Sequence, residues 1–340
     1  MTGAADRPAI VATLGPATRE EALRRRLLTV ATCLRLNTAH LAPGELAATL
    51  AALADLFARA GTTLPVVLDL QGAKVRIGDY PTVAAVPPRV ELRLAAASPD
   101  PAVIPVPHAS VFREARPGDL LHLNDRRVGL RVREVGGGGR LLADCIHNGP
   151  LAARKGLNCA ARRFELAQVT PGDRDALAIG VTYPFVDFAV SFVADGGEAA
   201  LFRPLAGGRR LVAKVERAAA LAALPALARD FDELWLCRGD LGAELGLRQL
   251  GPAQAAFVRA LPGLPRPCLL AGEVLGSLAH VPWPSRSEVV HLHDALAAGF
   301  AGFVLSDETA AGAHVAATLD FLAGFFALPG APAGFAAAGA

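Results

Sequence analysis

Short apolar runs alternate with longer alanine- and leucine-rich segments along most of this chain of 340 residues. A β-rich run followed by a segment of helical length is typical of βαβ units, which place parallel strands in one sheet. Eight such runs occur, at 9–14, 33–38, 65–70, 186–192, 210–216, 233–240, 268–273 and 302–309. Helices are predicted between them, for example at 43–60, 217–230, 252–260 and 286–298. The pattern therefore predicts an α/β protein built on a closed (β/α)8 TIM barrel.

The stretch between Arg76 and Asn158 interrupts this alternation. It contains short strands of alternating polarity and four consecutive glycines at 136–139, and it has no long helical pattern. We therefore predict a small all-β domain inserted after the third barrel strand. The predicted limits are 1–78 and 158–328 for the barrel, 79–157 for the inserted, β-barrel-like domain, and 329–340 for a disordered tail of low complexity.

Composition and charge exclude a few classes of protein. The net charge is only +2, so no strong field would attract nucleic acid or a membrane surface. The N-terminal residues contain no apolar stretch typical of a signal peptide, and we expect a cytoplasmic protein. The five cysteines are scattered without a C-x-x-C pair, which favours buried thiols over a zinc site or a disulfide.

Polar residues end nearly every predicted barrel strand. The C-terminal ends of the strands in a TIM barrel open onto one mouth, where the loops carry the chemistry. The residues at these ends are Arg35, Asn37, Asp69, Ser191, Lys214, Glu216, Arg238, Asp240, Glu273 and the run 306–309. One charged residue at a strand end is usually a solvated loop residue, but so many together predict a shared active site.

The residue types at this mouth narrow the chemistry. Glu216 and Asp240 offer the hard carboxylate oxygens that Mg²⁺ prefers. Arg35, Arg76 and Lys214 add positive charge, which suits an anionic substrate such as a phosphate ester. Phosphoryl transfer depends mainly on such positioning and charge stabilisation. Lys214 could instead form a Schiff base, but a lysine beside a metal-binding carboxylate would remain charged, which favours the electrostatic role.

Nine motifs in this order resemble those of the pyruvate kinase family, and they extend from the first strand to the last helix. They are IVATLGPAT (10–18), LRLNTAH (34–40), DLQGAKVRIG (69–78), ARKGLN (153–158), VDFAVSFV (186–193), AKVE (213–216), CRGDLGAELG (237–246), PSRSEV (284–289) and LSDETAAG (305–312). The resemblance implies a glycolytic phosphotransferase that moves a phosphoryl group from phosphoenolpyruvate to ADP, giving pyruvate and ATP.

The resemblance also implies roles for residues at the matching positions. Glu216 and Asp240 would hold Mg²⁺ or Mn²⁺. The residues implied for catalysis are Lys214, Arg35, Lys74 and Gly272. Those implied for substrate binding are Lys214, Gly239, Asp240, Gly272 and Ser191. Those implied for nucleotide binding are Arg35, Asn37, His40, Arg76 and Lys155, the last on an inserted domain that closes as a lid and excludes water.

Many members of the family bind a potassium ion through four oxygen ligands, and this chain resembles the branch that does not need it. Asn37 and Asp69 remain from that site, whereas Ala39 and Leu70 replace a serine and a threonine. Lys74 stands where the potassium-dependent type has a glutamate. Its ammonium group would supply the missing positive charge opposite Asp69, so K⁺ is not expected to be required. The alternative is that Lys74 is simply a solvated loop residue.

The sequence departs from the family pattern in three ways. Gly272 occupies the place of a threonine that hydrogen-bonds the substrate and helps protonate the enolate, so we expect reduced activity. Asp307 occupies the place of a glycine, and its direction is not evident from the sequence. The chain stops at residue 340, and we expect the C-terminal regulatory domain of the family, with its effector site, to be missing.

Two alternatives to a working kinase stay open. The first is a catalytically weak relative that binds phosphoenolpyruvate, pyruvate or a nucleotide as a sensor. The second is a metal-dependent lyase or aldolase that acts on a pyruvate enolate. The expected partners are the small molecules phosphoenolpyruvate and ADP, without nucleic acid or membrane, and a homo-oligomer is compatible with the sequence.

Overall fold

The computed structural model describes residues 7–124, 126–159, 164, 166 and 168–327. Contacts divide the chain into two compact units. The first unit comprises 1–72, 169–239 and 250–340, and the second comprises 73–168 and 240–249. The predicted domain limits at 78/79 and 157/158 both fall within the second unit, and the predicted tail lies outside the described residues.

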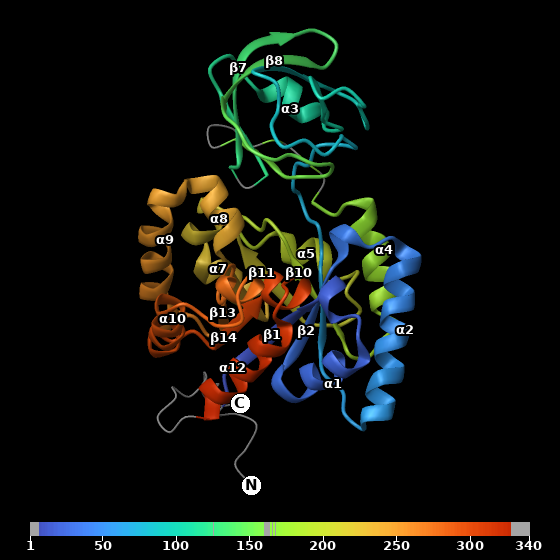
Figure 1. Ribbon diagram of the computed structural model, residues 1–340, viewed down its shortest axis with the longest axis vertical. Helices are drawn as coiled ribbons and strands as arrows, with labels where there is room; N and C mark the ends of the chain where they lie inside the picture. The colour runs from blue at the N-terminus through green and yellow to red at the C-terminus, as the bar shows by residue number, and fades with distance from the viewer. Residues whose placement is uncertain (1–6, 125, 160–163, 165, 167, 328–340) are drawn as a thin grey trace. The chain divides into compact units, whose positions relative to one another are not determined.

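Eight parallel strands close into a barrel in the first unit, which confirms the predicted fold class (Figure 1). The strands are β1 (Ala9–Leu14), β2 (Cys33–Asn37), β3 (Val66–Asp69), β10 (Val186–Val190), β11 (Leu211–Val215), β12 (Glu233–Cys237), β13 (Cys268–Ala271) and β14 (Gly302–Leu305). They follow one another around the barrel in chain order. Asn37 pairs with Asp69 in the register of β2 and β3, so the polar ends of neighbouring strands lie at one level.

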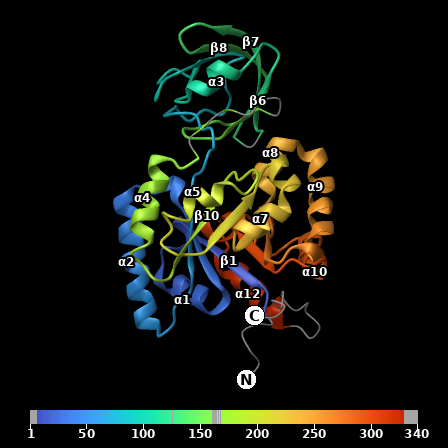
Figure 2. The ribbon, with the colours of Figure 1, turned by 180° about the vertical axis from the view of Figure 1, so that it is seen from behind.

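Helices surround the strands, as the two opposite views show (Figures 1 and 2). They are α1 (Glu21–Val30), α2 (Pro43–Ala60), α4 (Pro171–Gly180), α5 (Glu198–Phe202), α6 (Ala218–Ala222), α7 (Leu224–Asp230), α8 (Arg238–Leu245), α9 (Leu247–Ala260), α10 (Arg286–Ala297), α11 (Asp307–Ala310) and α12 (Val315–Ala327). Short 3-10 turns are η1 (Pro16–Thr18), η2 (Thr38–His40), η3 (Leu261–Gly263) and η4 (Gly276–Ala279). Within the described part of the chain, no helix has the length and apolarity to cross a membrane.

Two predicted helices differ from those observed. The segment 217–230 forms two helices, α6 and α7, which meet at Ala223 with φ −108° and ψ 14°. Helix α9 starts at Leu247 rather than at Pro252, and it contains that proline. Proline has no backbone N–H, and this loss matters least in the first turn of a helix, where the N–H groups have no partner in the helix. The sequence pattern therefore predicted the helix start at Pro252.

The second unit contains a six-stranded sheet with the order β5-β4-β8-β7-β6-β9, which confirms a small β-rich insertion after β3. Its strands are β4 (Arg89–Arg93), β5 (Val103–Pro105), β6 (Leu120–Leu123), β7 (Val128–Gly136), β8 (Arg140–His147) and β9 (Leu157–Cys159). Strands β4 and β5 are parallel, and the other pairs are antiparallel. One short helix, α3 (Ala109–Glu114), was not predicted.

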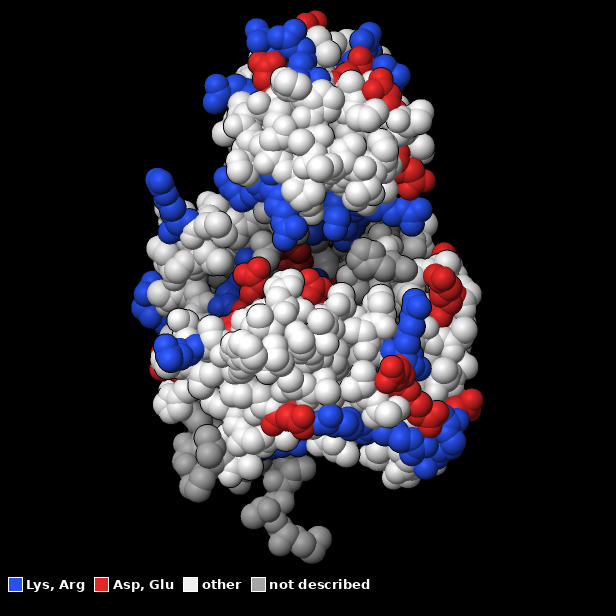
Figure 3. All heavy atoms as spheres, viewed as in Figure 1, with Lys and Arg blue, Asp and Glu red and all other residues white. Residues whose placement is uncertain are grey.

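Alternation of apolar and charged residues explains this sheet. Val90 and Leu92 of β4 are buried in the core of the unit, whereas Arg89 and Arg93 beside them are exposed. On the outer face, arginines pair with carboxylates, for example Arg133 with Asp144 at 2.8 Å. Figure 3 shows such mixed positive and negative side chains on this unit. Because these ion pairs are exposed, burial of the apolar face accounts for most of the stability.

Replacing Gly180 by alanine tests the packing of α4 on the barrel. A Cβ at this position would lie 2.7 Å from Phe188 Cε1 and 2.9 Å from Leu68 Cδ1. We expect Gly180→Ala to lower the free energy of unfolding by about 1–3 kcal/mol, because the core would be overpacked. The control is Gly44→Ala in helix α2, where no atom lies within 4 Å of the added Cβ. That variant should instead be more stable, by up to about 1 kcal/mol. Chemical denaturation of both variants measures the difference, and equal effects would contradict the packing argument.

Candidate active site

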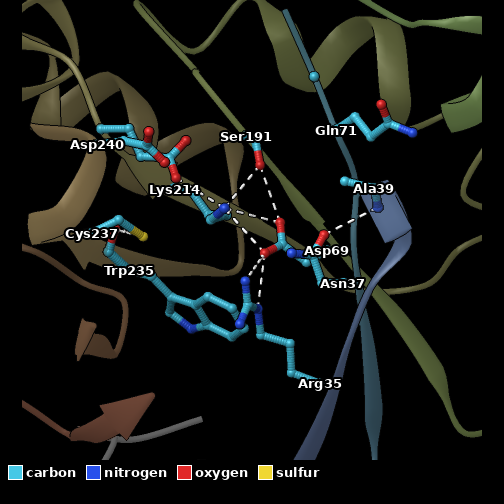
Figure 4. A network of polar contacts seen from close by, with 12 residues as sticks. Arg35, Asn37, Ala39, Asp69, Gln71, Ser191, Lys214, Trp235, Cys237 and Asp240 are labelled. Carbon is cyan, nitrogen blue, oxygen red and sulfur yellow. Dashed lines mark hydrogen bonds and ion pairs between the residues drawn. The ribbon is translucent and has the colours of Figure 1, made fainter. Parts of the chain in front are cut away.

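Asp69, the last residue of β3, lies at the centre of a buried charge network (Figure 4). Lys214 Nζ lies 3.0 Å from Asp69 Oδ1, and Arg35 Nε donates to Asp69 Oδ2 at 2.8 Å. Ser191 Oγ donates to Asp69 Oδ1 at 3.1 Å. Four barrel strands or the loops after them contribute these side chains, so the structure brings together four residues that the sequence placed at the mouth.

Arg35 is fixed on its other side by β1. Its Nη1 donates to Thr13 Oγ1 at 2.8 Å, and Thr13 Oγ1 donates to the carbonyl oxygen of Leu305 at 2.7 Å. Thr13 is buried and was not singled out in the sequence, where it is one threonine inside an apolar strand. These bonds hold the guanidinium group in one orientation at the barrel mouth.

Lys214 also contacts Glu216, the predicted metal ligand on the same strand end. Lys214 Nζ lies 2.9 Å from Glu216 Oε1 and 2.9 Å from Ser191 Oγ. Glu216 Oε2 accepts a hydrogen bond of 2.8 Å from the backbone N–H of Phe192, which has a left-handed φ of 59°. The Glu216 side chain is only 1% exposed, so its position is set by the protein.

The charges in this network stabilise one another. Burial alone would raise the pKa of Asp69, but Lys214 and Arg35 lower that pKa to about 2. Burial alone would lower the pKa of Lys214, but Asp69 and Glu216 hold it above its ordinary value. Lys214 is therefore a protonated cation. An amine must be unprotonated to attack a carbonyl carbon, so this environment disfavours the Schiff-base alternative.

Strand β12 contributes buried side chains to the barrel interior that were not assigned to the site from the sequence. Trp235 is buried in the cluster of side chains inside the barrel, together with Cys237. Its Nε1 donates to Glu233 Oε1 at 2.5 Å. Burial, and then the charge of Glu216, raises the pKa of the Cys237 thiol, which stays neutral. The two-residue spacing of Glu233, Trp235 and Cys237 could have predicted a common inward face.

Asp173, also missed in the sequence, holds the loop that follows Asp69. It lies in the first turn of α4 and accepts hydrogen bonds from the backbone N–H groups of Gln71, at 2.7 Å, and Gly72, at 3.3 Å. Gly72 has a φ of 60°, and a Cβ there would lie 2.4 Å from the Ser191 carbonyl oxygen. The capping pattern Thr170 to Asp173 was visible in the sequence, but the loop partner 102 residues away was not.

The backbone at Gly272 is suited to glycine. Its φ is 90°, and an added Cβ would lie 3.1 Å from the backbone nitrogen of Gly239. Arg238 Nε donates to the Gly272 carbonyl oxygen at 2.9 Å, and Arg238 Nη1 lies 2.8 Å from His291 Nε2. A threonine would be strained here, so the departure from the family pattern extends to the local backbone.

In the second unit, Lys74 forms an ion pair with the predicted metal ligand Asp240. Lys74 Nζ lies 2.5 Å from Asp240 Oδ1, and the Lys74 side chain is only 10% exposed. Gly156 leaves space for it, since a Cβ there would lie 2.7 Å from Lys74 Cε. Lys74 is therefore not a solvated loop residue. Its pairing with Asp69 would join the two units and stays a prediction.

The other predicted residues have varied surroundings. Asn37 Oδ1 accepts from the backbone N–H of Ala39 at 3.1 Å. Arg76 Nη1 donates to the carbonyl oxygen of Arg154 at 3.1 Å, whereas Arg76 Nε is buried without a hydrogen-bond partner among the described residues. Lys155 is exposed, and the side chain of His40 lies outside the described part of the chain.

Asp307 at the start of α11 is exposed, which answers the question that the sequence left open. Its neighbour Glu308 is buried and accepts hydrogen bonds from the backbone N–H groups of Leu275, at 3.1 Å, and Ser306, at 2.6 Å. Glu308 thus holds the loop after β13, whereas Asp307 adds a carboxylate at the surface.

The low pKa of Asp69 predicts a specific loss of stability in acid. The pKa of Asp69 in the folded protein, about 2, lies below its ordinary value of 3.8. The charged carboxylate therefore stabilises the fold at pH values above 3.8. This contribution is lost as the pH falls towards 2. We expect the difference in unfolding free energy between wild type and Asp69→Asn to shrink by roughly 2 kcal/mol from about pH 5 to about pH 2. Urea unfolding measures it, and a constant difference would contradict the predicted pairing.

Comparison with known proteins agrees with this site. A family model described as "Pyruvate kinase, barrel domain" matches residues 5–319. The chain is 32% identical to a pyruvate kinase of Agrobacterium vitis over 323 residues, covering 93% of this chain and 68% of that protein. It is 30% identical to pyruvate kinase II of Salmonella typhimurium over 334 residues, covering 93% and 68%. It is also 30% identical to a pyruvate kinase of Methylorubrum extorquens over 311 residues, covering 90% and 65%.

The chain thus spans about two thirds of the length of these relatives. The match includes the barrel, the inserted sheet and every residue of the charge network. On this evidence, the chain belongs to the pyruvate kinase family.

Proposed function

We propose that this protein is a Mg²⁺-dependent phosphotransferase that moves a phosphoryl group from phosphoenolpyruvate to ADP. The observation that carries the proposal is the network in which Lys214 contacts both Asp69 and Glu216 and Arg35 lies on the other side of Asp69. Fixed cations at a barrel mouth supply the charge stabilisation on which phosphoryl transfer depends. The named activity of the relatives supports the same reaction.

The carboxylates at the mouth fit Mg²⁺ in their chemistry. Mg²⁺ is usually bound through one or two carboxylates and completes its octahedron with water and substrate oxygens. In this proposal Glu216 and Asp240 would supply such ligands. A bound Mg²⁺ would neutralise negative charge on the substrate oxygens.

The side chains of the barrel perform the remaining functions in this proposal. Lys214 is kept protonated by Asp69 and Glu216 and stabilises charge on the phosphoryl group. The bond between phosphorus and the enol oxygen breaks as a bond forms to the terminal phosphate of ADP. The enolate that remains takes up a proton at carbon. Gly272 has no hydroxyl group, so another donor, Glu273 or water, would have to supply this proton, and we expect slower turnover than in a relative with a threonine.

Gly272 also favours a second candidate function. A chain that keeps the charge network but lacks the proton donor could bind phosphoenolpyruvate, pyruvate or a nucleotide without efficient turnover. Such a protein would act as a sensor. Measurable binding of phosphoenolpyruvate without pyruvate formation would distinguish it from the kinase.

The activity of a Lys214 variant tests the proposed reaction. Wild-type protein should form pyruvate from phosphoenolpyruvate and ADP when Mg²⁺ is present, as measured in a coupled assay. Lys214→Met should lower kcat/KM by about 10²–10³-fold, because a cation at the transferring group is lost. The control is Arg25→Met, which removes an exposed cation from α1 and should leave the rate unchanged. Equal rates for Lys214→Met and wild type would contradict the assigned role.

The response to potassium tests the role of Lys74. We propose that its ammonium group replaces the ion, so wild-type activity should be the same with K⁺ and without it. Lys74→Glu removes the cation from Asp240, and it should either require added K⁺ or lose activity altogether. Titration of both proteins with KCl at constant ionic strength measures this. An active, K⁺-insensitive Lys74→Glu protein would refute the replacement of the ion by Lys74.

A further inference from the structure

The turn between β6 and β7 contacts helix α8 within the second unit. Arg126 Nη1 donates to the carbonyl oxygen of Ala243 at 3.2 Å. Gly246, which follows the helix with a left-handed φ of 88°, lies beside this guanidinium group, since a Cβ there would be in van der Waals contact with Arg126 Nη1 at 3.5 Å. The last carbonyl groups of a helix have no partner in the helix and carry partial negative charge. A guanidinium group is therefore well suited to this end of α8.

The backbone of this turn is unusual. Asn124 has a φ of 49°, which asparagine tolerates, and Arg126 has a φ of 68°, in a left-handed region that an arginine rarely adopts. Other contacts hold the turn in place. Asn124 Nδ2 donates to the carbonyl oxygen of Pro150 at 2.8 Å, and the Asn124 N–H donates to that of Gly156 at 3.1 Å. Such conformations persist where surrounding contacts enforce them, often at functional sites.

The same part of the unit also contacts the first turn of α8. Asp240 in that turn pairs with Lys74, whose side chain passes over Gly156. Gly156 in turn accepts the hydrogen bond from Asn124. One connected group of residues therefore holds α8 at both ends, at Asp240 through Lys74 and at Ala243 through Arg126.

We infer that Arg126 is a positioning residue for Asp240. By fixing the C-terminal end of α8, it sets the direction in which the first turn presents the Asp240 carboxylate. This inference rests on the proposed function, in which Asp240 is a metal ligand. Residues that orient a ligand from outside the coordination sphere typically change metal affinity 10–100-fold when they are replaced.

Direct metal binding tests the inference without relying on turnover. The full chain is titrated with Mn²⁺, and free Mn²⁺ is followed by electron paramagnetic resonance. We expect Arg126→Met to weaken Mn²⁺ binding roughly tenfold. Arg126→Lys, which keeps one cationic donor, should recover part of the affinity. The matched control is Arg127→Met, since Arg127 is the next residue and is exposed.

Melting temperature, Mn²⁺ affinity and pyruvate formation together distinguish a positioning role from a purely structural one. Arg126→Met should keep the melting temperature of Arg127→Met while its Mn²⁺ affinity falls, which a purely structural role would not produce. Equal Mn²⁺ affinities in these two variants would overturn the inference. If Arg126→Met does not fold, the comparison of Arg126→Lys with Arg127→Met decides in the same way. If the affinities change as expected but wild type forms no pyruvate, the proposed reaction fails and the positioning role stands.

Discussion

The pairing of the buried Asp69 carboxylate with Lys214 and Arg35 is the interaction on which the site depends. An isolated charge in a protein interior is costly, and removing one partner of a buried pair leaves the other uncompensated. The three residues come from β2, β3 and β11, and β10 lies between β3 and β11 in the barrel, so they meet only when these neighbouring strands pair. Pairing of these strands and assembly of the charge network are therefore one requirement on the sequence.

Carboxylates also hold the loops around this network. Glu216 binds the N–H of Phe192, Asp173 binds that of Gln71, and Glu308 binds that of Leu275. Each acid lies on an element other than the loop it holds. Groups that are fixed before substrate arrives need little reorganisation during reaction, and this is how electrostatic catalysis gains its effect. The mouth of the barrel is thus ordered by the same residue type that would bind the metal.

Local patterns in the sequence were sufficient to predict the eight strands and the inserted sheet. The reason is that each strand, and its alternation with a helical segment, can be recognised from consecutive residues. Two predicted strands were too long, because Arg238 and Asp240 begin helix α8 and residues 307–309 lie in α11. The partners of Lys74 and of Asp173 could not be predicted, because each pairing joins residues more than a hundred positions apart. The left-handed backbone at Gly272 was also hidden, since a glycine alone does not reveal its φ. Proline in α9 misled the prediction of where that helix starts.

The two tryptophans of the chain lie in opposite surroundings, so intrinsic tryptophan fluorescence can distinguish the protein interior from its surface. Trp235 is 1% exposed inside the barrel, with its indole N–H bonded to Glu233, whereas Trp283 is 64% exposed. Indole fluorescence shifts with the polarity of its environment. Emission from the interior indole can be separated from that of the surface one by adding a soluble quencher. Spectral changes in the shielded component then report on the packing beneath the charge network, with no label attached.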